Sequence, residues 1–285
     1  MDRQKIKRSF SKAAPTYDAS AEVQKDAAAR LAGCVGVFMD DGMEFSTHEM
    51  NTPVFRQRVQ GCVLPAPRPL ILDAGCGTGN LMAEVGGRWP HARLVGCDIA
   101  TPMLEKAKER LADAALAASD CAALPFGDGV FDMVVSNLAF QWVDIYEAFS
   151  EAHRTLKPGG LLVFSTLGPD TLSELRTSCS EAAPGVEFPL ELRSIDEMES
   201  KLEECGLEPL SVDVHPVFKR YAGVLELVRK LKDIGAAPAA PGAGGFSGAV
   251  MLRRAGGAYA RRFPAPGGAG VIATYEVIFM AARKR

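Results

Sequence analysis

The chain of 285 residues has no apolar stretch approaching the roughly 20 residues that a membrane-spanning helix needs. Its basic N-terminus, MDRQKIKRSFSKAAPTY, runs into no apolar segment like that of a secretory signal peptide. We therefore expect a cytoplasmic protein without a membrane anchor. Because no acidic residue follows Asp2 until Asp18, a transit peptide is the alternative interpretation of this start.

The sequence also lacks an excess of positive charge. It has 32 Lys and Arg against 35 Asp and Glu, which gives a formal net charge of −3. This balance excludes a protein-wide positive field of the kind that attracts nucleic acid or an anionic membrane. An acidic partner would need a local basic patch, for which there are two candidate sets: Lys5, Arg8 and Lys12 on one helical face, and Arg253, Arg254, Arg261 and Arg262 in a later helix.

Cysteine motifs are missing as well. The seven cysteines are odd in number and widely spaced, and they form no CxxC motif or Cys/His cluster. A disulfide framework and a structural zinc site are therefore not expected. Reduced thiols in a cytosol fit this pattern best.

Short apolar runs alternate with amphipathic segments from Pro69 onward. PLILDAG, ARLVGCD and FDMVVSN read as strands, with helices expected from Thr78 and Thr101 between them. This alternation predicts a doubly wound α/β fold with a mostly parallel sheet and helices on both faces. We expect one catalytic domain at 69–285, preceded by a helical arm and a connector or lid at 1–68.

The C-terminal half continues with further helices and strands. Helix start signals are a Thr101 cap with Pro102, and capping-box spacing in Asp144 with Glu147 and in Ser194 with Glu197. Lys157 to Gly160 should end a helix before the strand LLVFSTL. Helices are expected near 170–181, 194–205, 225–234 and 249–262, a strand near 211–218, and VIATYEVIFMAAR as a final edge strand.

The segment DAGCGTG, Asp73 to Gly79, carries the strongest chemical signal. It follows a strand and opens a helix, and Gly75, Gly77 and Gly79 permit a tight turn that approaches a ligand closely. Asp98, nineteen residues later, ends the next strand and could accept hydrogen bonds from two ribose hydroxyls. Together these features predict a nucleoside-binding site rather than a plain strand-to-helix turn.

The glycine spacing separates two cofactors. NAD sites usually carry GxGxxG, whose helix N-terminus holds a pyrophosphate. Here the spacing is GxGxG with an acid just before it, which resembles motif I of the class I methyltransferases. That resemblance implies S-adenosylmethionine (SAM) as cofactor, and a seven-stranded, Rossmann-like sheet with an antiparallel C-terminal strand.

Further stretches resemble the same class, SDCAALPF and FDMVVSNLAFQW. The resemblance implies that Asp120 meets the adenine amino group and that Cys121 offers a backbone amide. Asp73 would hold the SAM amino group or buttress the turn, two roles that the sequence does not separate. The remaining expected cofactor contacts are Thr78, Ile99, Met103, Asn137, Leu138, Gln141 and Trp142; for Phe140 and Trp142, core packing is an equal alternative.

Three longer segments resemble one family more closely: RSFSKAAPTYDASAEVQ, SNLAFQWVD and FSTLGPDTLSELR. VRKLKDIGA and the terminal ATYEVIFMAARK fit the same family, the malonyl-acyl-carrier-protein O-methyltransferases of biotin synthesis. Only residues 34–66, longer here than usual, stand outside the resemblance. It implies methylation of the free carboxyl of a malonyl thioester carried by acyl carrier protein or by CoA.

The family pattern implies that Tyr17 and Arg176 grip the malonyl group, with Phe188 as a weaker third candidate. Without that pattern, Arg176 reads as an exposed helix arginine, and Tyr17 as an aromatic on an apolar face. Two alternative functions remain: methylation of another small acceptor, such as a quinone precursor or small acid, and a SAM-fold assembly factor of respiratory complex I.

Overall fold

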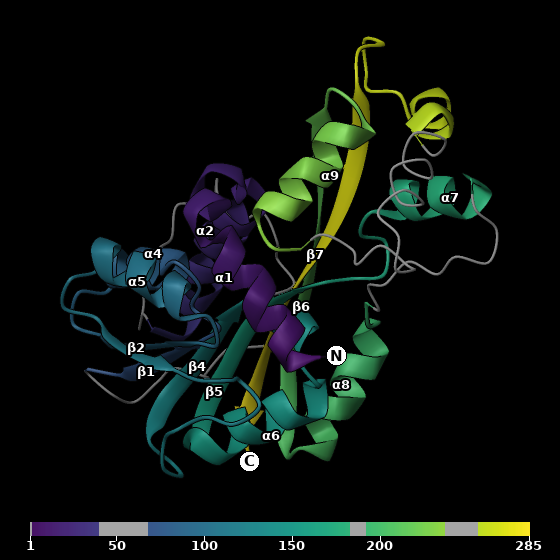
Figure 1. The fold of residues 1–285 in the computed structure, drawn as a ribbon. Coiled ribbons are helices and arrows are strands. Elements are labelled where there is room, and N and C mark those ends of the chain that lie inside the picture. Colours follow the sequence, from purple (N-terminus) through teal and green to yellow (C-terminus); the bar gives the residue numbers. More distant parts are fainter. Residues whose placement is uncertain (1, 40–67, 183–191, 237–255) are drawn as a thin grey trace.

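A seven-stranded sheet forms the centre of the protein (Figure 1), in a computed structural model that describes residues 2–39, 68–182, 192–236 and 256–285. The strand order is β3-β2-β1-β4-β5-β7-β6. Five strands run parallel, namely β1 (Leu70–Ala74), β2 (Arg93–Asp98), β3 (Ala115–Ala118), β4 (Phe131–Asn137) and β5 (Leu156–Leu167). The order reverses between β1 and β4, which is where a doubly wound fold binds its ligand.

The last strand, β7 (Val271–Lys284), pairs antiparallel with both β5 and β6 (Leu207–Tyr221). The prediction of an antiparallel C-terminal strand is confirmed, but its predicted place at the sheet edge is wrong. β7 lies inside the sheet and β6 forms the edge. Every residue from 277 to 282 is buried, because helices or segments cover both faces of an interior strand.

Alternate side chains of the strands pack into two separate hydrophobic cores, one on each face of the sheet. Ile71 joins the core that contains α2 (Glu22–Met39), α4 (Asn80–Arg88), α7 (Ser173–Ala182) and α9 (Val224–Asp233). Leu72 points to the opposite face and joins the core that contains α6 (Ile145–Thr155) and α8 (Ile195–Glu204). This two-residue period produces the three-layer arrangement.

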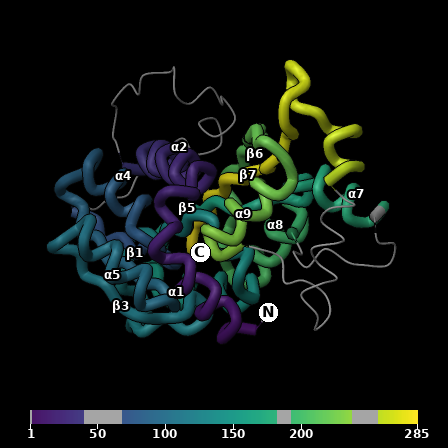
Figure 2. Tube along the Cα trace, turned by 45° about the horizontal axis from the view of Figure 1, so that its top comes forward, coloured from purple at the N-terminus to yellow at the C-terminus, as the bar shows by residue number. Residues whose placement is uncertain are grey.

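The N-terminal arm is helical, as the spacing of Ile6, Phe10, Ala13 and Tyr17 predicts. It consists of α1 (Arg3–Ser20) and α2, and α1 packs against α5 (Thr101–Arg110) and α9. Both views show α1 crossing the carboxyl ends of the parallel strands (Figures 1 and 2). The arm therefore covers the carboxyl ends of the parallel strands, where the glycine turn lies.

The predicted helix starts have mixed outcomes. Ser194 and Glu197 form the expected capping box, and Asp144 accepts the amides of Tyr146 and Glu147. Thr101 is not a cap, because Ala100 occupies that position, with Pro102 in the first turn. The Ala100 amide donates to the Asp98 carboxylate at 2.8 Å, so the acid that ends β2 binds the residue that precedes the helix.

Other boundaries shift by a few residues. The helix expected from Thr78 begins at Asn80, and the one expected from position 170 begins at Ser173. Lys157 to Gly160 do end α6, yet they already belong to β5. Of the helix predicted near 249–262, residues 256–262 are helical and the rest lie outside the described residues. Among the described helices, none is long and apolar enough to cross a membrane.

Candidate cofactor and acceptor site

The glycine turn follows β1 and is hydrogen-bonded to the end of the neighbouring strand β2. The amides of Gly75 and Cys76 both donate to the Cys97 carbonyl at 2.8 Å, and the Gly77 amide donates to an Asp98 carboxylate oxygen at 2.9 Å. Gly75 has a φ of 79° and Gly77 one of 53°, both in the left-handed region that favours glycine. The turn is thus held by the end of β2, together with one hydrogen bond of its own from the Gly79 amide to the Cys76 carbonyl at 2.9 Å.

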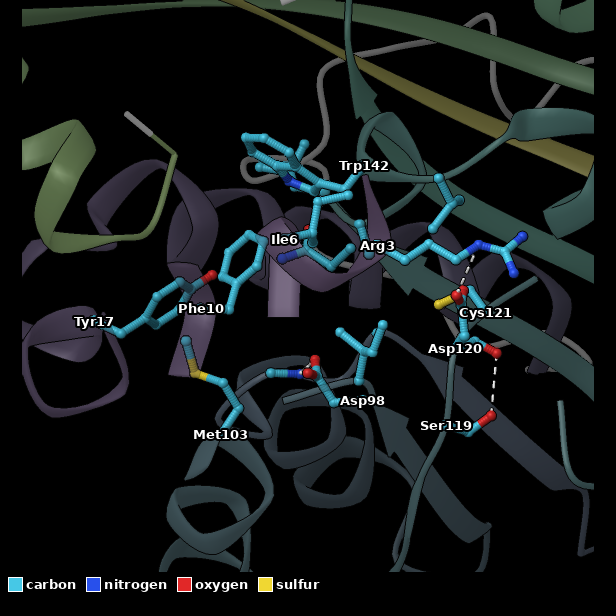
Figure 3. Close-up of a pocket in the computed structure, with 17 residues that line it drawn as sticks. Arg3, Ile6, Phe10, Tyr17, Asp98, Met103, Ser119, Asp120, Cys121 and Trp142 are labelled. Atoms are coloured by element: carbon cyan, nitrogen blue, oxygen red, sulfur yellow. Dashed lines mark hydrogen bonds and ion pairs between the residues drawn. The ribbon is translucent and has the colours of Figure 1, made fainter. Parts of the chain in front are cut away.

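A cavity of about 650 Å³, counting space open to solvent, lies over this turn (Figure 3). It is closed on one side by α1 and on the other by the ends of β1, β2 and β4. Its lining contains eleven of the predicted site residues: Tyr17, Gly75, Gly77, Asp98, Ile99, Met103, Asp120, Cys121, Asn137, Leu138 and Trp142. The sequence therefore brings most of its chemically informative residues to one place.

Sequence reasoning missed six lining residues. Arg3, Ile6 and Phe10 come from α1, while Ser119, Ala139 and Val143 belong to loops at the strand ends. The apolar spacing of α1 predicted a buried helix face, but nothing in that pattern indicates which part of the fold it faces. The arm and the strand ends are distant in the sequence and come together only in the tertiary structure.

Asp98 lies at the floor of the cavity. It accepts hydrogen bonds from the backbone amides of Gly77 and Ala100, one on each oxygen. Burial raises the pKa of this carboxyl, although the two amide hydrogen bonds act in the opposite direction. Each oxygen keeps a further lone pair, so Asp98 can accept ligand hydroxyls while it supports the turn.

Asp73 is buried beside this floor, with 2% of its surface exposed. Both of its carboxylate oxygens are buried without a hydrogen-bond partner in the described residues. Burial, and next the charge of Asp98, raises the pKa of Asp73 to about 8. An unpartnered carboxylate fits a cationic ligand group and disfavours a pyrophosphate, so the site fits the amino group of SAM better than NAD.

Asp73 is not among the residues that line the cavity, and three other predicted contacts also lie outside the lining. Gly79 has a φ of 79° and caps α4, and a side chain there would press against Ala107 of α5. The Thr78 hydroxyl donates to Asp18, and Gln141 is a buried neighbour of Thr166. In this structure Gly79 serves helix packing, and the ligand roles of Thr78 and Gln141 stay predictions.

Asp120 stands at the far end of the cavity. One of its oxygens accepts the Ala122 amide at 2.9 Å, and the other pairs with the Arg3 guanidinium at 3.3 Å. Arg3 also pairs with Glu147 of α6. Figure 3 shows that Arg3 reaches across from the arm to Asp120. The first turn of α1 is thereby fastened beside the position expected for the adenine.

Aromatic and apolar side chains form the opposite end. The rings of Phe10 and Trp142 pack edge to face, with centroids 5.4 Å apart. Trp142 therefore both lines the cavity and packs against the arm, whereas Phe140 is 1% exposed and belongs to the core with Phe149 and Phe164. Core packing is thus the correct interpretation for Phe140.

Tyr17 is the polar group of this apolar end. Burial, then the charges of Asp98 and Asp18, raises the pKa of its phenol well above the ordinary value. The hydroxyl stays protonated at neutral pH and can donate a hydrogen bond. It is therefore suited to hold an anionic acceptor and unsuited to act as a base.

The other end of α1 is fastened by Asp18. Its carboxylate accepts from the Thr78 hydroxyl at 2.7 Å and pairs with Arg110 of α5 at 2.7 Å. The Asn80 amide donates to it at 3.4 Å. This group of contacts, which we call the Asp18 latch, ties the arm to the glycine turn and to the helix that follows it.

The exit of β4 shows one unusual backbone conformation. Leu138 has a φ of 50°, which side-chain-bearing residues rarely adopt. Its amide donates to the Ser165 carbonyl and hydroxyl, and Ser165 donates to the Asn137 side chain at 2.8 Å. These contacts hold Asn137 and Leu138 against the cavity.

Arg176 lies apart from this cavity. It is on α7, partly buried, and its guanidinium donates to the Pro169 carbonyl. Phe188 lies outside the described residues. Their roles as acceptor contacts stay predictions.

A seven-stranded sheet of this order, with an acid near the end of β1, a glycine turn after it and a second acid at the end of β2, defines a class I SAM-dependent methyltransferase. Residues 72–164 match the family model described as a methyltransferase domain. The backbone resembles a Bacillus halodurans protein assigned to the methyltransferases (TM-score 0.54, 19% identity, 80% of this chain and 97% of that one). It also resembles YcgJ from Bacillus subtilis (TM-score 0.53, 17% identity, 76% and 92%). At such identities the likeness shows the fold alone.

Full-length relatives identify the family. The chain is 32% identical to the malonyl-acyl-carrier-protein O-methyltransferase of Geobacter sulfurreducens, over 98% of each chain. It is 34% identical to the protein of that name from a Methylovorus species, over 98% of this chain and 88% of the relative. The protein belongs to the malonyl-acyl-carrier-protein O-methyltransferase family. The predicted class, fold and SAM cofactor are confirmed.

Proposed function

We propose that the protein transfers the methyl group of SAM to the free carboxyl of a malonyl thioester on acyl carrier protein, as a step in biotin synthesis. The observation that carries this proposal is the similarity, over nearly the whole chain, to relatives that bear this name. A relative that also matches 98% of this chain is a bifunctional biotin biosynthesis protein of Saccharophagus degradans.

The cavity chemistry supports a carboxylate acceptor. A carboxyl group has a pKa of about 4, so it is ionised at neutral pH and needs no general base. Among the described lining residues there is no histidine or lysine, and the Tyr17 phenol stays protonated. The two lining carboxylates, Asp98 and Asp120, already accept backbone or guanidinium hydrogens.

When bound, SAM supplies a methyl group on a positively charged sulfur, which keeps the electron pair of the broken carbon–sulfur bond. The acceptor oxygen forms the new bond to the methyl carbon, and its negative charge disappears. Because opposite charges are neutralised during transfer, an apolar surrounding assists the reaction. Ile6, Phe10, Met103 and Trp142 provide that surrounding, and Tyr17 donates to the acceptor carboxylate to align it.

The proposed cofactor roles combine the positions of these residues with the resemblance to class I methyltransferases. Asp73 would receive the amino group, Asp98 the ribose hydroxyls, and Asp120 with the Cys121 amide the adenine. The family resemblance adds Arg176 and Phe188 as contacts of the malonyl thioester. We place the reaction in the cytoplasm, which fits the six described cysteines, all of them free thiols.

The test is transfer of labelled methyl from SAM to purified malonyl carrier protein, with acetyl carrier protein as the control that lacks the free carboxyl. We expect label on the malonyl form alone. Equal labelling of both forms, or of neither while SAM still binds, would redirect the search to another acceptor, such as the quinone precursors or small acids considered above.

A further inference from the structure

Five exposed cations gather on the outer faces of two helices, and we call this set the α1/α9 basic face: Lys5, Arg8, Lys12, Arg229 and Lys232. Within the described part of the chain, none of the five makes an ion pair. Cations on other helices do, as Arg88 with Glu84, Lys106 with Glu109 and Lys201 with Glu204 show.

The two helices touch, so their cations form one surface. The Thr16 hydroxyl donates to the Asp233 carbonyl at 2.9 Å. Gly235 packs so closely on α1 that an added side chain would meet Phe10 at 3.1 Å. Lys12 lies one helical turn before Thr16, and Lys232 directly precedes Asp233. Figures 1 and 2 both show α9 beside α1.

The α1 half of this face contains no acid, and neither acid of α9, Glu226 or Asp233, forms an ion pair with its cations in the described residues. Between Asp2 and Asp18 the sequence of α1 contains no acid. Asp2 caps the helix, Asp18 belongs to its latch, and Glu226 accepts the Ala222 amide. The whole chain carries a net charge of −3, so this positive region is local.

The inner face of the same helix closes the cofactor cavity. Ile6, Phe10 and Tyr17 line the cavity, while Lys5, Arg8 and Lys12 are exposed on the outside. A protein that settles on the outer face of α1 therefore lies one helix diameter from the reacting groups. That position suits a partner that delivers a tethered substrate.

We propose that the α1/α9 basic face docks an acidic surface of the carrier protein; this rests on the proposed function. Charges at the rim of an interface accelerate and orient association, and salt screens them. The face then selects the carrier, and the cavity selects the malonyl carboxyl. The rate of methyl transfer to a small malonyl thioester without a carrier should not depend on the α1/α9 basic face.

The experiment compares two double charge reversals. Arg8→Glu/Lys12→Glu changes the proposed face. Arg93→Glu/Arg285→Glu makes the same charge change at two exposed cations that lie near the amino ends of the parallel strands, away from α1. Lys232→Glu tests the α9 half separately. Binding of fluorescently labelled malonyl carrier protein is titrated for each, alongside methyl transfer to malonyl carrier protein and to malonyl-pantetheine.

We expect the face variant to bind malonyl carrier protein about tenfold more weakly and to lose most of its salt dependence. Its SAM affinity and its transfer to malonyl-pantetheine should match wild type, and Lys232→Glu should show a smaller loss of carrier binding. Carrier binding equal to that of the Arg93→Glu/Arg285→Glu control would overturn the docking proposal. A wild type that binds carrier but methylates neither thioester would overturn the proposed function instead.

Discussion

The Asp18 carboxylate accepts a hydrogen bond from the Thr78 hydroxyl at 2.7 Å, and this contact joins the N-terminal arm to the glycine turn. Arg110 pairs with the same carboxylate from α5. The arm supplies Phe10 and Tyr17 to the cavity, so its position decides whether the cavity is closed. The cofactor and the arm should therefore stabilise each other.

Removing the Asp18 latch should weaken SAM binding. We expect Asp18→Ala to lower SAM affinity about five- to tenfold, because one hydrogen bond and a half-exposed ion pair are worth roughly 1–1.5 kcal/mol together. Asp18→Asn should lie between, since its amide oxygen can still accept from Thr78. Calorimetry measures the affinities, with Glu109→Ala as the control on α5. An Asp18→Ala affinity no lower than that of the control would refute the latch.

Substitution of Asp98 should lower SAM affinity more than substitution of Asp18, because we assign Asp98 two roles. Asp98→Ala removes the proposed acceptor of the ribose hydroxyls and also frees the amides of Gly77 and Ala100. Hydrogen bonds to charged groups are worth about 1.5–3 kcal/mol, so we expect SAM affinity to fall at least tenfold. Asp98→Asn should lose less thermal stability than Asp98→Ala while still binding SAM poorly. Unchanged calorimetric affinity in either variant would contradict the assignment.

Asp73 gives the protein a specific pH dependence. Burial raises the pKa of Asp73 from its ordinary value of 3.8 to about 8, so the neutral acid is the favoured buried form. Its stability contribution is complete below pH 3.8 and is lost as the pH rises through about 8. Without ligand, the Tm of wild type should fall more steeply than that of Asp73→Asn between about pH 5 and 8, and the two slopes should converge above that range.

The same residue should respond to ligand. An ammonium group beside Asp73 favours the carboxylate, so SAM binding at pH 7 should release a fraction of a proton from wild type and less from Asp73→Asn. Calorimetry in buffers of different ionisation enthalpy measures that release. Identical release from both proteins would show that Asp73 does not face the amino group.

Two glycines of the turn should respond differently to alanine. At Gly75 an added methyl group would overlap the Ala139 side chain, so Gly75→Ala should lower thermal stability. At Gly77 no atom lies within 4 Å of such a methyl group, so Gly77→Ala should cost only about 1–2 kcal/mol of backbone strain. Gly77 lines the cavity, and its variant should remain folded yet bind SAM poorly. Tight SAM binding by folded Gly77→Ala would place the ligand elsewhere.

Arg176 should affect the acceptor rather than the cofactor. We expect Arg176→Ala to keep the wild-type SAM affinity, since the residue lies outside the described cavity lining, and to slow methyl transfer to malonyl carrier protein. Arg176→Lys should recover part of that rate, because it restores the positive charge. Wild-type turnover by Arg176→Ala would remove this residue from the acceptor site.

The strand order illustrates what the sequence alone could and could not predict. The strands β1, β2, β4 and β5, the glycine turn and the acids at the ends of β1 and β2 are local patterns, and the structure has them where predicted. β3 was missed because ALAA is too short and too uniform to show alternation. The interior place of β7 could have been inferred from its continuous apolar run, which indicates burial on both faces.

The site residues also divide into those that the sequence could predict and those that it could not. The glycines of the turn and Asp98 have a local signature in their spacing, and the resemblance to class I methyltransferases added Asp120 and Asn137; all of these except Gly79 line the cavity. Arg3 and Asp18 could not, because each meets its partner only after the arm has folded across the sheet. Pairings between such distant segments leave no periodicity in the sequence.

The central claim is that the product is a carboxyl methyl ester of the malonyl group. The most direct measurement is mild alkaline treatment of the labelled product from SAM and malonyl carrier protein, followed by analysis of the volatile label. We predict release of labelled methanol, since a methyl ester is hydrolysed under these conditions. Label that stays on the non-volatile fraction would show that carbon, nitrogen or sulfur had been methylated, and would contradict the account.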